Sequence, residues 1–124
     1  METFKNANDE FVGYNGTDQW YRHELTQLIY TDGVKQIADK YEAYWLIDKI
    51  LILNKTTNFF DEEFQCWTLQ RVMDKDQPTP HMCLMMDDGN GVVIFATSLP
   101  FTDFKADTVT MWFENETLYL PQER

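Results

Sequence analysis

The sequence predicts an α+β fold, with two to three N-terminal helices, the third of them buried, packed on one face of a C-terminal antiparallel β-meander of about five strands. Three observations carry this prediction. Apolar residues recur at helical spacing in the first part of the chain and alternate with polar residues after it. No helical segment separates the later strands, which excludes a parallel βαβ arrangement. The 124 residues suffice for one core.

The chain divides into a polar arm at residues 1–16 and a single domain at residues 17–124. Thr17 or Asp18 can cap a first helix at residues 19–30, because a short side-chain oxygen accepts hydrogen bonds from the exposed N–H groups of a first turn. Thr31 is the corresponding cap for a second, short helix that we expect over residues 32–40.

The longest apolar run, YEAYWLIDKILIL at residues 41–53, predicts the third helix. Isoleucine-rich runs also form strands, but Ala43 and the Asp48-Lys49 pair favour a helix here. Its apolar residues surround most of the helix, which is typical of a buried helix packed on more than one face. At about 13 residues the run is shorter than the roughly 20 needed to span a bilayer.

The remaining segments alternate with the period of strands. Asp87-Asp88-Gly89-Asn90-Gly91 lacks the ligand spacing and distal Glu of a calcium loop, and it predicts a hairpin turn. Residues 74–80 contain two prolines and are expected to form a turn or loop. The expected strands are residues 63–73, 81–86, 92–97, 108–113 and 117–120.

Composition limits the classes of partner. The formal net charge of −11 argues against direct nucleic-acid binding, which needs a basic surface, and is compatible with a basic protein partner. The N-terminal stretch lacks an apolar signal region, so we expect a cytoplasmic protein with no membrane association. The two cysteines, Cys66 and Cys83, are expected to be buried free thiols rather than a disulfide.

Acidic residues recur in pairs at expected loop tips, and these are the first candidate binding surface. Water solvates such positions, so the simplest interpretation is a solvated rim. The functional interpretation is an acidic surface that competes with phosphate for a partner's lysine and arginine residues. The candidates are Asp61, Glu62, Glu63, Asp87, Asp88, Glu114 and Glu116.

A second candidate site is a pocket between the expected first helix and the sheet, near Asp18, Tyr21, His23 and Asp32. No catalytic, metal-binding or cofactor motif accompanies these residues, so we predict no catalytic residues, no metal and no cofactor. Asp48, expected inside the buried helix, needs a hydrogen-bond partner there.

Four motifs of the sequence carry a resemblance to known proteins. They are GTDQWYRH at residues 16–23, YTDGVK at residues 30–35, AYWLID at residues 43–48, and TDF at residues 102–104 followed by EN at residues 114–115 and LYLP at residues 118–121. Each is similar to a motif of a family of small uncharacterised proteins from bacterial genomes, plasmids and phages. The resemblance covers residues 16–121 and implies a mobile-element or prophage setting. It implies no activity and no catalytic residues.

The sequence therefore leads to a non-enzymatic, acidic protein of mobile-element type that binds another protein. The expected partner is basic and handles nucleic acid, as for an anti-CRISPR-like inhibitor of a bacterial defence nuclease. The alternatives are a small enzyme or ligand-binding domain with a pocket near His23, and an acidic host accessory domain. An excess of aromatic residues beyond the needs of one core would mark a homodimer interface.

Overall fold

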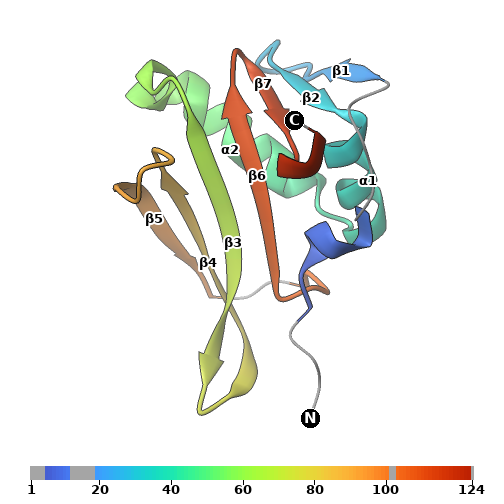
Figure 1. The fold of residues 1–124 in the computed structure, drawn as a ribbon, viewed down its shortest axis with the longest axis vertical. Coiled ribbons are helices and arrows are strands. Elements are labelled where there is room, and N and C mark those ends of the chain that lie inside the picture. The colour runs from blue at the N-terminus through green and yellow to red at the C-terminus, as the bar shows by residue number, and fades with distance from the viewer. Residues whose placement is uncertain (1–4, 12–18, 101–102, 124) are drawn as a thin grey trace.

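The computed structural model describes residues 5–11, 19–100 and 103–123, which form a seven-stranded sheet with two α-helices on one face (Figure 1). Neighbouring strands are antiparallel except β2 and β7, which are parallel. The α+β prediction is broadly correct, but its three helices and simple five-stranded meander are wrong. The strands, in their order across the sheet, are β1 (Trp20–Arg22), β2 (Ile29–Thr31), β7 (Thr117–Tyr119), β6 (Thr108–Glu114), β3 (Gln65–Asp74), β4 (Gln77–Asp87) and β5 (Val93–Leu99).

The expected first helix at residues 19–30 is instead the hairpin formed by β1 and β2. Tyr21 lies opposite Tyr30 in this hairpin, and their rings stack with centroids 5.6 Å apart. The apolar residues that suggested a helical stripe do not form one, because Leu25 is 79% exposed at the turn. Aromatic and β-branched residues at both ends of the segment favour strands, and cross-strand packing decides the outcome.

The helix α1 (Asp32–Tyr41) begins where the sequence predicts. The Thr31 hydroxyl accepts a hydrogen bond from the Val34 N–H group, which confirms Thr31 as the N-cap. The helix ends at Glu42, whose left-handed backbone places its N–H group against the Ala38 carbonyl. The next helix, α2 (Tyr44–Thr56), follows at once and confirms a helix in the long apolar run.

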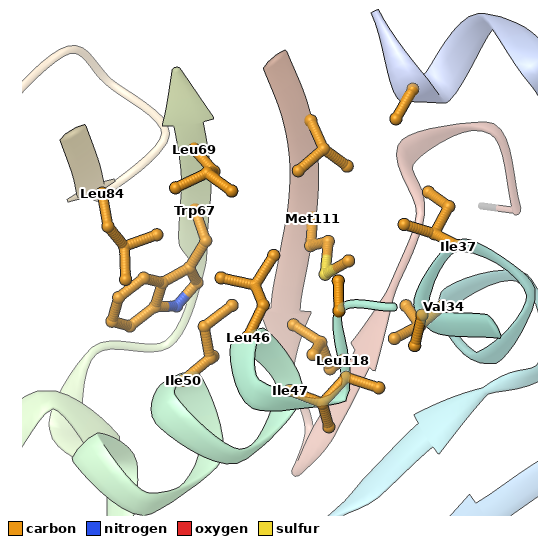
Figure 2. Close-up of a cluster of buried hydrophobic side chains, with 14 of the residues drawn as sticks. Val34, Ile37, Leu46, Ile47, Ile50, Trp67, Leu69, Leu84, Met111 and Leu118 are labelled. Carbon is orange, nitrogen blue, oxygen red and sulfur yellow. The ribbon is translucent and has the colours of Figure 1, made fainter. Parts of the chain in front are cut away.

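One face of α2 packs against the sheet, so the prediction of burial on more than one face is wrong. Figure 2 shows Leu46, Ile47 and Ile50 of this helix directed toward strand side chains that include Trp67 and Met111. The opposite face is open, because the helices form a single layer on the sheet, and Tyr44 there is 40% exposed. Full burial of each aliphatic side chain in this layer stabilises the fold by about 1.5–3 kcal/mol.

The hairpin between β3 and β4 projects beyond the rest of the sheet (Figure 1). The turn or loop expected over residues 74–80 is shorter than predicted, since only Lys75 and Asp76 form the turn, both with positive φ, and the flanking residues belong to β3 and β4. Pro78 and Pro80 belong to β4, in a part of that strand that extends past its pairing with β5. Prolines are tolerated there because the strand has a partner on one side only.

The N-terminal segment of the described chain packs on the sheet. The 3-10 helix η1 (Ala7–Phe11) buries Ala7 completely in the core. The Asn8 side chain replaces a missing strand neighbour of β6, because its Nδ2 group donates to the Thr110 carbonyl at 2.9 Å and its Oδ1 atom accepts from the Thr110 N–H group at 2.7 Å. Residues 5–11 of the expected arm are therefore held by the domain.

The C-terminal 3-10 turn, η3 (Pro121–Glu123), holds the start of α1. The buried Glu123 carboxylate accepts hydrogen bonds from the Thr31 hydroxyl at 2.6 Å, the Leu120 N–H group at 2.8 Å and the Gly33 N–H group at 3.3 Å. A carboxylate at a helix N-terminus also interacts favourably with the helix dipole. This contact links the C-terminal turn to the start of α1.

Candidate functional site

Strand register gathers the acidic loop tips at one end of the sheet. In β3, Cys66 lies opposite Asp87 of β4 on one side and Trp112 of β6 on the other. The next residue toward the N-terminus, Gln65, lies opposite Phe113. The start of β3, the end of β4 and the end of β6 therefore lie side by side.

We call this region the acidic end. The 3-10 helix η2 (Asn58–Asp61) and the two glutamates that follow it precede β3, while the other acidic residues end β4 and β6 or lie in the turns after them. The structure thus brings together the acidic candidates that the sequence scattered over some fifty positions. They are Asp61, Glu62, Glu63, Asp87, Asp88, Glu114 and Glu116.

The first of two open hollows at this end has a volume of about 410 Å³. It combines glutamate side chains with the rings of Phe60 and Phe113, whose centroids are 6.2 Å apart. Phe60 is 40% exposed and also carries the Lys55 ammonium group 5.4 Å from its ring centroid, which is a cation–π distance. The lining residues are Phe60, Glu62, Glu63, Phe113, Glu114, Asn115 and Glu116.

The second hollow has a volume of about 430 Å³ and lies across the turn between β4 and β5. Its aromatic part is the edge-to-face pair of Phe64 and Trp112, with centroids 5.3 Å apart. Asp88 fixes the turn, since its Oδ1 atom accepts from the N–H groups of Asn90 and Val92. The lining residues are Phe64, Asp88, Gly89, Asn90, Trp112 and Glu114.

Glu114 lines both hollows and is held in place by a hydrogen bond from the Tyr119 hydroxyl. Tyr119 in turn packs edge-to-face on Trp112, with centroids 6.1 Å apart. Carboxylates beside aromatic rings suit a guanidinium or ammonium group, which pairs with the oxygens and stacks on the ring. In the described part of the chain, no three His, Cys, Asp or Glu side chains gather so that they could hold a metal ion.

The Cys66 thiol lies in the middle of this end. Burial, and then the negative charge of Asp87, raise the pKa of the Cys66 thiol above its ordinary value. Cys66 and Cys83 are both free, as expected, but they are half-buried rather than buried. A raised pKa keeps the Cys66 sulfur protonated and poorly reactive near neutral pH.

Comparison with known proteins places the chain in a family. A model of a family of unknown function, DUF6876, matches residues 5–124. The chain belongs to DUF6876. No curated protein and no solved structure matches this DUF6876 chain. Among the described residues, no helix combines the length and apolar character that crossing a membrane requires.

The second candidate site of this DUF6876 protein lies around the β1–β2 hairpin and the start of α1. Asp18 lies outside the described residues. Tyr21 and Asp32 both contact Gln19, the former through its hydroxyl group and the latter through its backbone N–H group. His23 follows β1 in the same hairpin as Tyr21, and none of these residues lines either hollow of the acidic end.

His23 links the β1–β2 hairpin to α2. Its Nε2 atom is 2.7 Å from Asp48 Oδ1 and its Nδ1 atom is 2.9 Å from the Thr26 hydroxyl. The Thr26 oxygen also accepts from the Leu28 N–H group, so these contacts fix the turn of the hairpin. Asp48 has the hydrogen-bond partner that the sequence required, although its side chain is 54% exposed rather than buried.

Sequence reasoning missed the aromatic half of the acidic end. The site predicted from the sequence contains no aromatic residue from this end of the sheet. Four aromatic residues nevertheless line the hollows, namely Phe60, Phe64, Trp112 and Phe113. A local signal was present, because aromatic residues directly flank the acidic runs in FFDEEF and in WFENE. Such neighbouring rings and carboxylates, in segments that the sheet brings together, indicate a mixed acidic and aromatic surface.

Proposed function

We propose that this protein binds a basic protein partner through the acidic end and catalyses no reaction. The observation that supports this most directly is the pair of hollows that share Glu114, each with carboxylates beside aromatic rings. Aromatic residues surrounded by polar groups are favoured anchors in protein interfaces. The net charge of −11 would steer a basic partner to the protein and increase the association rate.

The partner that fits this surface best is a nucleic-acid-handling protein. Such proteins line their binding grooves with arginine and lysine, which neutralise phosphates. An acidic protein that occupies the groove would act as an inhibitor, in the manner of an anti-CRISPR protein acting on a bacterial defence nuclease. The mobile-element setting implied by the resemblance of the sequence motifs agrees with this role and with action in the cytoplasm.

The two alternatives have less support. A pocket near His23 would need a free imidazole nitrogen, and both ring nitrogens lie within hydrogen-bond distance of neighbouring side chains. An acidic accessory domain would need charge only for solubility, and an even spread of carboxylates would serve that purpose. The gathering of acidic residues around aromatic hollows favours a binding role over both.

The test compares two double variants that remove equal charge. Glu62→Gln with Glu63→Gln changes the acidic end, and Glu24→Gln with Glu42→Gln changes exposed positions elsewhere. The probe is a fluorescent arginine-rich peptide, followed by a purified bacterial defence nuclease, titrated at several salt concentrations. Two lost exposed pairs are worth about 0.4–2 kcal/mol, so the first variant should bind about 2- to 30-fold more weakly.

The control variant should keep the affinity of the unmodified protein, and binding of both should weaken as salt increases. Equal losses in the two variants would show that only overall charge matters, which contradicts a site at the acidic end. Binding that ignores salt would contradict the proposed electrostatic recognition. Peptide binding without inhibition of any nuclease would retain the basic partner and reject the inhibitor role.

A further inference from the structure

The outer edge of β5 has the properties of a strand that pairs with another strand. β5 is the last strand of the sheet and pairs with β4 on one side (Figure 1). In the part of the chain that the structure describes, no strand lies on its other side. In an antiparallel sheet, alternate residues of such a strand direct their N–H and C=O groups away from their neighbour.

Two of the devices that normally protect a sheet edge, charged side chains and proline, are missing from β5. The sequence VVIFATSL at residues 92–99 contains no charged residue and no proline. Val93 is 58% exposed and Ile94 is 37% exposed, and the irregular pairing with β4 lies at the very start of the strand. The opposite edge of the sheet, β1, has only three residues and carries Arg22. Long uncharged edges pair readily with other strands.

We propose that β5 pairs with β5 of a second copy of this chain, antiparallel and about a two-fold axis, to form a dimer with one continuous sheet. Identical strands are self-complementary in this arrangement, because each copy offers the same backbone groups. Charge selects this edge, since two copies of net charge −11 repel each other except where the surface is uncharged. This inference is independent of the proposed partner of the acidic end.

The orientation follows from the position of the acidic turn. Asp87 and Asp88 lie at one end of β5, beside Val93. A parallel pairing would place the acidic turns of the two copies side by side, which is destabilising. An antiparallel pairing separates them by the length of the strand, about 20 Å, which exceeds the screening length of about 8 Å at physiological salt.

The register that best matches the side chains facing each other across the two copies of β5 is centred on Ala96. It places Ile94 opposite Ser98 of the second copy and Phe95 opposite Thr97 of the second copy. Phe95 and Leu99 already pack against the core from the helix-covered side, so this register continues that side across the dimer. On the open side it places Ala96 opposite Ala96 of the second copy and the larger Ile94 opposite the small Ser98, so that no like charges face each other across the pair.

Sedimentation equilibrium over a range of concentrations tests the dimer. The unmodified protein should form a dimer, and Ala96→Lys should be monomeric with unchanged circular dichroism. Val72→Lys adds the same charge at a 44% exposed position on β3 and should remain dimeric. Ser98→Lys serves as a second edge variant, should Ala96→Lys lower the stability of the monomer. A monomeric unmodified protein, or a dimer unaffected by both edge variants, would overturn the proposal.

Cross-linking tests the register. In a background with Cys66→Ser and Cys83→Ser, Ala96→Cys should form a disulfide with its counterpart on mild oxidation, because directly paired residues approach to disulfide distance. Val72→Cys in the same background should form none. A cross-link at position 72, or none at position 96 in a protein that dimerises, would overturn the two-fold pairing through Ala96.

Discussion

Two glycines in the turn between β4 and β5 provide a matched test of the second hollow. Gly89 and Gly91 have nearly equal positive φ values, 87° and 89°. A Cβ atom on Gly89 would lie 2.7 Å from Cδ2 and 3.0 Å from Cε2 of the Phe64 ring, whereas one on Gly91 would meet no atom within 4 Å. Gly91→Ala therefore introduces backbone strain alone, and Gly89→Ala adds a steric clash with Phe64.

The expected magnitudes separate the two variants. An L-residue in the left-handed region costs about 1–2 kcal/mol, which both variants share. Displacing a packed side chain costs a further 1–3 kcal/mol or so, which applies to Gly89→Ala only. The free energy of unfolding should thus fall by about 1–3 kcal/mol more in Gly89→Ala than in Gly91→Ala.

The assay is urea unfolding followed by circular dichroism, combined with titration of the arginine-rich peptide. Phe64 packs on Trp112, so its displacement should reshape the hollow and weaken peptide binding in Gly89→Ala. Binding by Gly91→Ala should match the unmodified protein. Equal stability losses in the two variants would refute the packing of Phe64 on this turn. Unequal stability with equal peptide affinity would instead remove the second hollow from the binding site.

Two further predictions concern the interior. Glu123→Ala should lower the free energy of unfolding by about 3–5 kcal/mol, because it leaves buried donors at Thr31, Leu120 and Gly33 without their acceptor. Exposed Glu24→Ala should change it by less than about 0.5 kcal/mol, and a loss at Glu123 no larger than this would contradict the capping role. The raised pKa of Cys66 means that the fold favours the protonated thiol, so this contribution to stability is complete below the unfolded pKa of about 8.5 and is lost as pH rises through the folded value. In a Cys83→Ser variant, alkylation by iodoacetamide should therefore need a higher pH than alkylation of free cysteine, and a profile at or below that of free cysteine would refute the shift.

Local features of the fold were predictable from the sequence. The Thr31 cap, the alternation of β3 and the turn after Asp87 depend on neighbouring residues only, and each is found where the sequence indicates. The β1–β2 hairpin was not predictable in this way. Its apolar residues fit a helical spacing as well as a strand, and cross-strand packing of Tyr21 on Tyr30 decided between them.

The acidic end shows the same division between local and distant effects. Its carboxylates could be named from the sequence because they lie in turn-like runs. Their proximity depends on the register of β3 with β6, for example Gln65 opposite Phe113, and spacing along the chain does not determine such distant pairing. The parallel pairing of β2 with β7, which completes the sheet, likewise cannot be predicted from the hydrophobic periodicity of the sequence.

The placement of side chains at the acidic end lowers the folding stability of the domain. Like charges brought together repel, and a 40% exposed Phe60 leaves apolar surface in water. The core does not require either feature, because its buried residues lie between the helices and the sheet. Solubility would be served as well by carboxylates spread over the open face of the sheet. A basic partner with apolar stems on its arginine and lysine side chains relieves both costs at once, since it neutralises the carboxylates and covers the rings.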